Sequence, residues 1–124
     1  IATSPRKNPS ELGTRVELAE QALSHINGVE VARFNVLTVD YAQKIGATAI
    51  LKGIRTVTDF EYEFQMLNMN RALVPELETI FLATSEEFSY ISSSLVRQIA
   101  GYGGNVEKFV CPEVAKALQD GVIT

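Results

Sequence analysis

The sequence predicts an α/β fold with a doubly wound parallel sheet, that is, a sheet with helices on both faces. Helical and strand-like patterns alternate along the chain, which is the order that crossover helices between parallel strands produce. The strand-like segments 47–51 (ATAIL) and 79–84 (TIFLAT) are mostly apolar with no alternating polar face. Such runs are typical of strands that are buried on both faces.

The first expected elements are a helix and a short strand. Segment 11–28 has apolar residues at helical spacing, Thr14 and Glu17 match a capping box, and Gly28 ends the pattern. VEVARF, residues 29–34, has the composition of a short strand.

Two helices are expected next. Residues 38–45 predict a short helix that Gly46 ends, and the apolar strand 47–51 follows it. Thr58 and Glu61 match a second capping box, which would open a long helix that ends before Pro75. After the strand 79–84, a polar loop leads to another helix, and Pro112 begins a last short helix that Gly121 closes.

Composition limits the possible classes of protein. With 124 residues and 46% hydrophobic content, the chain can bury one sizeable core, so we expect a single domain over residues 1–124. The formal net charge of −4 argues against a general nucleic-acid or anionic-membrane binder. No apolar run approaches the roughly 20 residues of a transmembrane helix. Cys111 is the only cysteine, which excludes an internal disulfide and fits a reducing compartment.

Basic residues gather where the predicted strands end. Ligands of parallel sheets bind beyond the carboxyl ends of the strands. Five of the eleven basic residues follow predicted strands or open the next helix: Arg6, Lys7, Lys52, Arg55 and Arg97. This edge of an acidic protein therefore predicts a site for several phosphate groups.

Three consecutive serines, Ser92 to Ser94, precede an apolar helical pattern, with Arg97 one turn inside it. A helix start presents unpaired N–H groups that bind anions, and hydroxyls add donors. The alternative is a simple N-cap, for which one serine suffices. KGIR has two readings as well: Gly53 could admit a ligand between Lys52 and Arg55, or the stretch is a solvated turn. Nothing in the spacing predicts a protein metal site.

Two stretches carry a specific resemblance: KGIRTVTDFEYEFQMLNMNR (52–71) and EEFSYISSSLVRQIAGYGGNVEKFVCPEV (86–114). They closely resemble bacterial phosphopantetheine adenylyltransferases, and the resemblance covers essentially the whole chain. It implies a Rossmann-like nucleotidyltransferase fold and transfer of AMP from ATP to 4'-phosphopantetheine, giving dephospho-coenzyme A and pyrophosphate. It also implies Mg²⁺, a homohexamer and a cytoplasmic location.

The resemblance also implies roles for individual residues. Lys7 and Arg55 would be catalytic, and Lys7, Thr38 and Lys52 would bind the acceptor substrate. Lys52 stands where the family often has Arg, so that it keeps the charge without the bidentate geometry. The implied ATP contacts are Gly53, Ile54, Arg55, Glu63, Phe88, Ser89, Tyr90, Ile91, Ser92, Ser93 and Ser94.

The chain departs from the family at its beginning. It opens with IATSP, which resembles the end of a strand, and it contains neither the family's Ser/Thr-Phe-Asp-Pro motif nor the Gly-His that follows it; His25 lies in the wrong place to replace that histidine. A Phe that the family carries before the first helix is also absent. We therefore expect the domain to be N-terminally incomplete, without its first βα unit, and the literal chain to be inactive.

Two alternatives remain open. The chain can be another nucleotidyltransferase of the same superfamily, such as a cytidylyltransferase or a pyridine-nucleotide adenylyltransferase. It can also be a non-catalytic nucleotide-binding module, if the first motif is truly absent. Measuring which nucleotide and which acceptor the protein requires would test the first alternative. Identifying the true N-terminus would test the second.

Overall fold

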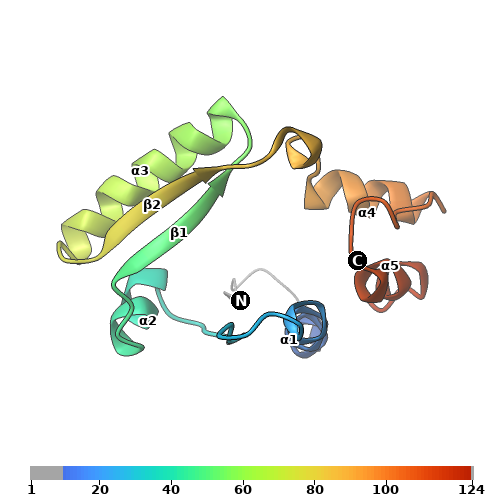
Figure 1. Cartoon of the computed structure of the whole chain (residues 1–124), viewed down its shortest axis with the longest axis horizontal. Coiled ribbons are helices and arrows are strands. Elements are labelled where there is room, and N and C mark those ends of the chain that lie inside the picture. The colour runs from blue at the N-terminus through green and yellow to red at the C-terminus, as the bar shows by residue number, and fades with distance from the viewer. Residues whose placement is uncertain (1–9, 124) are drawn as a thin grey trace. The chain divides into compact units, whose positions relative to one another are not determined.

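The computed structural model describes residues 10–123 (Figure 1). The chain forms two compact units. Of the described residues, 10–35 and 91–123 belong to unit 1, and 36–90 make up unit 2. Each unit is described by itself below. The single nucleotidyltransferase domain over residues 1–124 stays a prediction.

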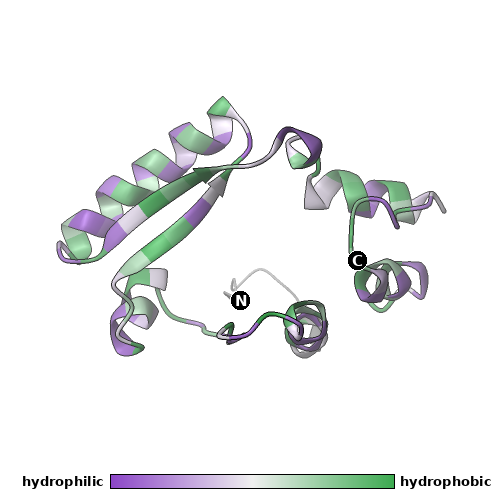
Figure 2. Cartoon of the chain, viewed as in Figure 1, coloured by the Kyte–Doolittle hydropathy of each residue, from purple (hydrophilic) through white to green (hydrophobic). Residues whose placement is uncertain are grey.

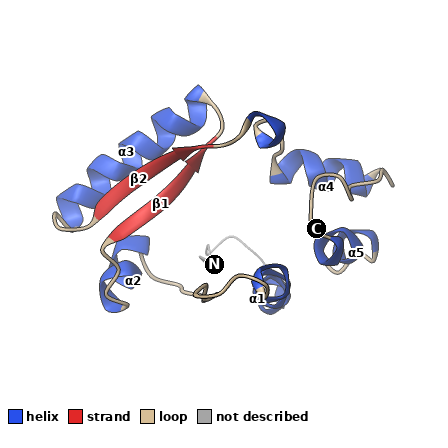
Figure 3. Ribbon diagram, in the orientation of Figure 1, coloured by secondary structure: helices blue, strands red, loops and turns tan. Residues whose placement is uncertain are grey.

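Unit 2 contains a parallel sheet of two strands, β1 (Ala49–Ile54) and β2 (Glu78–Ala83) (Figure 3). Helix α3 (Val57–Leu73) connects the strands, and Leu51 pairs with Ile80 in the register. This β–α–β arrangement confirms the predicted α/β class with a parallel sheet and is consistent with a Rossmann-like nucleotidyltransferase fold. Both strands are displaced by one to three residues from the predicted segments, because the apolar runs do not mark where pairing begins and ends.

Helix α3 covers one face of the sheet (Figure 1). The ring of Phe60 stacks on that of Phe64, with the centroids 5.6 Å apart, and meets Phe81 of β2 edge-on at 5.7 Å. Leu67, one helical turn further on, is buried. Aromatic pairs in these arrangements add to the apolar area that the helix removes from water. These contacts fix the start of α3 over the carboxyl half of β2.

The second face of the sheet differs from the prediction. Leu51, Ile80 and Leu82 are all about half exposed or more, although the sequence predicted strands buried on both faces. Figure 2 shows that hydrophobic residues run along both strands. Within unit 2 only the face toward α3 is covered.

A small core cluster lies near the amino ends of β1 and β2 in unit 2. Helix α2 (Thr38–Lys44) contributes the buried residues Val39 and Ala42, which cluster with Val74 and Leu77 from the segment between α3 and β2. The helix ends close to the predicted residue, with Gly46 at a φ of +70°, a conformation that glycine adopts without steric strain. Ala47 and Ile50 pack against this cluster.

In unit 1 the first helix begins earlier than predicted. Helix α1 spans Ser10–Leu23, so Thr14 lies inside the helix and the predicted capping box of Thr14 and Glu17 is wrong. The predicted strand 29–34 is also wrong, because residues 29–33 have no regular strand structure and only Phe34 takes a single strand-type bridge. Composition indicates an extended segment there but does not decide whether a regular ladder forms.

The last two helices of unit 1 follow the prediction, whereas α1 ends at Leu23 and not at Gly28. Helices α4 (Ser93–Gly101) and α5 (Pro112–Gln119) enclose a core of Val96, Val106 and Ala115. Pro112 occupies the first turn of α5, as expected, because its missing N–H is one that a helix start leaves unpaired anyway. None of the helices within residues 10–123 is long and apolar enough to cross a membrane.

Candidate nucleotide-binding site

Lys52 lies inside β1 and not in the loop that the sequence predicted. Along the strand, Ile50, Lys52 and Ile54 are half-buried and alternate with exposed residues. Because side chains alternate between the faces of a strand, these three share one face. Phe81, the residue paired with Lys52, contacts α3 through Phe60, so this face is the one that α3 covers.

On this face Lys52 forms an ion pair with Glu63 of α3. Its Nζ lies 3.1 Å from Oε2 of Glu63, and the two side chains are 34% and 21% exposed. Oε2 itself is enclosed, and its approach to Nζ does not have the angles of a hydrogen bond. The distance still places opposite charges in direct contact, so the pair is an electrostatic one with little directional character.

Arg55 follows β1 and is tied to Asp59, in the first turn of α3. Oδ2 of Asp59 accepts from the Nε–H of Arg55 at 3.2 Å and from its backbone N–H at 3.3 Å. The backbone N–H of Asp59 in turn donates to Oγ1 of Thr56 at 3.0 Å, so that Thr56 is the N-cap of α3. The predicted capping box of Thr58 and Glu61 is therefore wrong by two residues.

The carboxyl ends of β1 and β2 are joined by hydrogen bonds. The carbonyl of Ile54 accepts from the backbone N–H of Thr84 at 3.0 Å and from its hydroxyl at 3.2 Å. Gly53 lies in the strand and is exposed, and a Cβ built on it would meet nothing within 4 Å. The strand end is therefore held firmly, while the space over Gly53 is open.

Lys52, Glu63, Arg55 and Asp59 form what we call the β1–α3 charge cluster. It consists of two ion pairs, Lys52 with Glu63 and Arg55 with Asp59, so the cluster is formally neutral, and each side chain is partly exposed. Such an arrangement holds long basic side chains in defined positions while leaving part of their surface in contact with solvent. Lysine and arginine in such positions can stabilise phosphate oxygens by charge-assisted hydrogen bonds.

The other predicted residues of unit 2 lie on α2 and on the loop after β2. Thr38 is the first residue of α2 and is exposed. The segment after β2 contains a short 3₁₀ helix, η1 (Glu86–Phe88), followed by Ser89 and Tyr90. Phe88 and Tyr90 both have more than half of their surface exposed.

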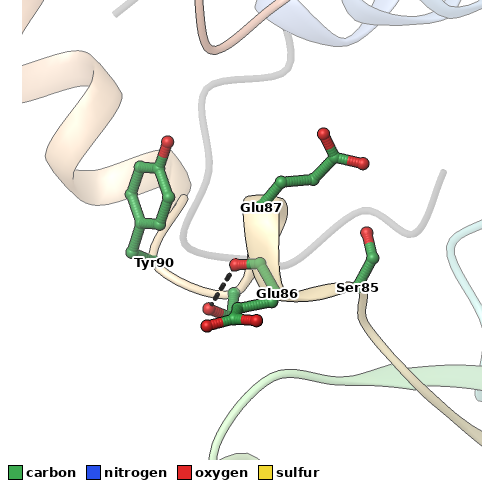
Figure 4. A pocket seen from close by; sticks show the side chains of 5 residues that line it. Ser85, Glu86, Glu87 and Tyr90 are labelled. Carbon is green, nitrogen blue, oxygen red and sulfur yellow. Dashed lines mark hydrogen bonds between the residues drawn. The ribbon is translucent and has the colours of Figure 1, made fainter.

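A shallow hollow lies along this loop (Figure 4). It is lined by Ser85, Glu86, Glu87, Ser89 and Tyr90. The hydroxyl of Ser89 donates to the carbonyl of Glu86 at 2.8 Å, which fixes the turn. Two carboxylates make this hollow unsuited to a triphosphate but compatible with the uncharged parts of a ligand.

The serine run belongs to unit 1. Ser92 is the N-cap of α4, because its Oγ accepts from the N–H of Leu95 at 3.2 Å. Ser93 and Ser94 form the exposed first turn of the helix, and Ile91 is half-buried and packs against the core of this unit. One hydroxyl therefore serves as a cap, and two remain in excess of what the cap needs.

The structure brings together only part of the predicted set. Lys52, Glu63 and Arg55 share one cluster, and Arg97 is exposed on α4 in unit 1. Arg6 and Lys7 fall outside the described residues. Within residues 10–123 no group of three or more His, Cys, Asp or Glu side chains is arranged to hold a metal ion.

Sequence reasoning missed three residues of this region: Asp59, Thr56 and Thr84. A signal existed for the first two, because Thr56 and Asp59 have the Thr-x-x-Asp spacing of an N-cap and its partner. The competing pair Thr58 and Glu61 has the same spacing, and the choice depends on where β1 ends. Nothing in the local sequence indicated the hydrogen bonds of Thr84, because its partner Ile54 lies 30 residues away in the chain.

The comparison with known proteins gives one family. A family model described as cytidylyltransferase-like matches residues 2–99 of the 124-residue chain. The matched range includes the whole β1–α3 charge cluster, the loop after β2 and the serine run.

Proposed function

Because the chain belongs to the cytidylyltransferase-like family, we propose that it transfers AMP from ATP to 4'-phosphopantetheine, giving dephospho-coenzyme A and pyrophosphate. Membership indicates nucleotidyl transfer and the binding of a nucleoside triphosphate. The choice of ATP and of the acceptor comes from the resemblance of residues 52–71 and 86–114.

The observation that carries the proposal is the β1–α3 charge cluster at the end of β1. Lys52 and Arg55 are held there by Glu63 and Asp59. Nucleotidyl transfer needs cations at fixed positions, because charge builds up on the oxygens of the α-phosphate as the acceptor attacks. Side chains that are already in place cost less to order when the substrate binds.

The reaction is an in-line displacement. An oxygen of the acceptor phosphate forms a bond to the α-phosphorus of ATP, and the bond from that phosphorus to the bridging oxygen breaks, so that pyrophosphate leaves. In this proposal Arg55 stabilises the phosphates of ATP, and Lys52 holds the acceptor phosphate. No protein nucleophile takes part, so that catalysis rests on positioning and electrostatics.

The proposal also assigns residues to the nucleoside and to the phosphates of ATP. Tyr90 lines the hollow of Figure 4 and Phe88 ends η1 just before it; both are exposed and would contact the nucleoside. Ser93 and Ser94 would bind phosphate at the start of α4. Mg²⁺ enters with the phosphates of the MgATP substrate, which is the usual way in which this ion is bound. The same proposal includes a cytoplasmic homohexamer.

A substrate panel tests the proposal. The full-length protein is incubated with Mg²⁺ and with ATP or CTP, each with 4'-phosphopantetheine, nicotinamide mononucleotide or phosphocholine, and pyrophosphate release is measured. The proposal expects release with ATP and 4'-phosphopantetheine only. The family description makes CTP a specific second candidate, and release with CTP and phosphocholine would establish it instead.

A further inference from the structure

Asp59 makes three hydrogen bonds, which link it to Arg55 and Thr56 at the start of α3. Its Oδ2 accepts from both the Nε–H and the backbone N–H of Arg55, at 3.2 and 3.3 Å. Its own backbone N–H is fixed by Oγ1 of Thr56 at 3.0 Å. The carboxylate is therefore anchored by the helix cap on one side and binds the arginine on the other.

We propose that Asp59 is a positioning residue for Arg55 during nucleotide binding. This inference rests on the proposed function, because it assumes that Arg55 binds the phosphates of ATP. An arginine side chain loses much rotamer freedom when it is immobilised. A carboxylate that already restricts this freedom lets the guanidinium meet a phosphate with a smaller loss of entropy on binding.

The atoms used in the contact fit this role. The contact with Asp59 uses Nε–H, one of the five N–H donors of the guanidinium. Bidentate binding of phosphate uses a pair of parallel N–H groups. Because the guanidinium is planar, holding Nε and the backbone N–H on one carboxylate oxygen restricts the direction in which the terminal nitrogens point.

A purely structural role explains the pair less well. The side chains of Arg55 and Asp59 are 34% and 30% exposed, and ion pairs with this much solvent contact contribute little to stability. The capping of α3 depends on the hydroxyl of Thr56 and the backbone of Asp59, not on the Asp59 carboxylate. The carboxylate of Asp59 therefore binds Arg55 and takes no part in the cap.

The test is a double-mutant cycle on ATP binding in the full-length protein. Dissociation constants for MgATP are measured by calorimetry for the wild type, Asp59→Asn, Arg55→Ala and the double variant. Glu61→Gln is the matched control, because it removes a carboxylate from the same part of α3 at an exposed position. The free energy of unfolding of each variant is measured in urea.

We expect Asp59→Asn to weaken MgATP binding about tenfold, within the coupling range of residues in direct contact. In the Arg55→Ala background the same change should have almost no effect, and Glu61→Gln should bind as the wild type does. Equal effects of Asp59→Asn with and without Arg55, or an effect no larger than that of Glu61→Gln, would overturn the inference.

The failure of the proposed function gives a different result. If the wild type binds MgATP with the expected coupling but releases no pyrophosphate with 4'-phosphopantetheine, the proposed acceptor is wrong and the role of Asp59 stands. If the wild type does not bind MgATP, both the proposed function and this inference are overturned.

Discussion

Nζ of Lys52 and Oε2 of Glu63 are 3.1 Å apart across the interface between β1 and α3. The resemblance assigns Lys52 to the acceptor and Glu63 to ATP, so the ion pair links residues expected to serve different substrates. Since Oε2 is enclosed, a change in Lys52 also alters the surroundings of Glu63. The proposal therefore places a direct charge–charge contact between the acceptor side and the ATP side of the site.

The first prediction concerns this partly buried ion pair. Lys52→Met leaves the carboxylate of Glu63 without its counter-charge, and we expect the free energy of unfolding to fall by about 1 kcal/mol. Arg71→Met breaks the more exposed pair of Arg71 and Glu78, whose side chains are 55% and 64% exposed. This change should alter the free energy of unfolding by less than about 0.5 kcal/mol. Urea unfolding checks both values, and an equal loss in the two variants would contradict the account.

The second prediction separates the observed cap of α3 from the one that the sequence suggested. Thr56→Ala removes the hydroxyl that accepts from Asp59 N–H and should lower the free energy of unfolding by about 1 kcal/mol. Thr58→Ala, inside the helix, should be neutral or slightly stabilising, since alanine has the higher helix propensity. Thermal unfolding of the two variants distinguishes them, and the reverse order of stability would mean that α3 begins two residues later.

The third prediction divides the serine run into a structural and a functional part. Ser92→Ala removes the cap of α4 and should destabilise the protein by about 1 kcal/mol. Ser93→Ala and Ser94→Ala should leave unfolding nearly unchanged but weaken MgATP binding about tenfold each, the usual scale for a hydrogen bond to a charged group. Wild-type affinity in both of the latter variants would remove this helix start from the site.

The fourth prediction concerns the turn after α4. Gly104 donates to the carbonyl of Ile99 at 2.8 Å, and a Cβ on Gly104 would lie 2.6 Å from Cγ2 of Ile99. Gly104→Ala should therefore destabilise the protein by about 1–3 kcal/mol through overpacking. Gly101→Ala is the control, because a Cβ there meets nothing within 4 Å; a neutral Gly104→Ala would show that the turn can open.

Much of the fold could be read from local patterns. The apolar runs located β1 and β2 to within three residues, and Gly46 and Pro112 marked helix boundaries correctly. These signals depend on short-range physics: the conformational freedom of glycine, the missing N–H of proline and the hydrophobicity of a buried strand. A serine N-cap was the alternative interpretation of the serine run, and the structure shows Ser92 in that role.

The charge cluster could not be predicted in the same way. The sequence suggested that Lys52 stands in a loop with Arg55, both directed at a ligand. Extension of β1 to Ile54 places Lys52 on the face toward α3, where Glu63 reaches it. Which carboxylate meets which cation depends on the packing of α3 across the sheet, and that is a tertiary property.

The most direct measurement of the central claim is the steady-state kinetics of Arg55→Ala in the full-length protein, with MgATP and 4'-phosphopantetheine as substrates. We predict that kcat falls by about 10²-fold, the scale expected when a group that stabilises transition-state charge is removed. The free energy of unfolding should change by less than about 1 kcal/mol, because the Arg55–Asp59 pair is partly exposed. Arg71→Ala, which removes an exposed arginine of α3, should retain the wild-type kcat. Near-wild-type kinetics of Arg55→Ala would contradict the account.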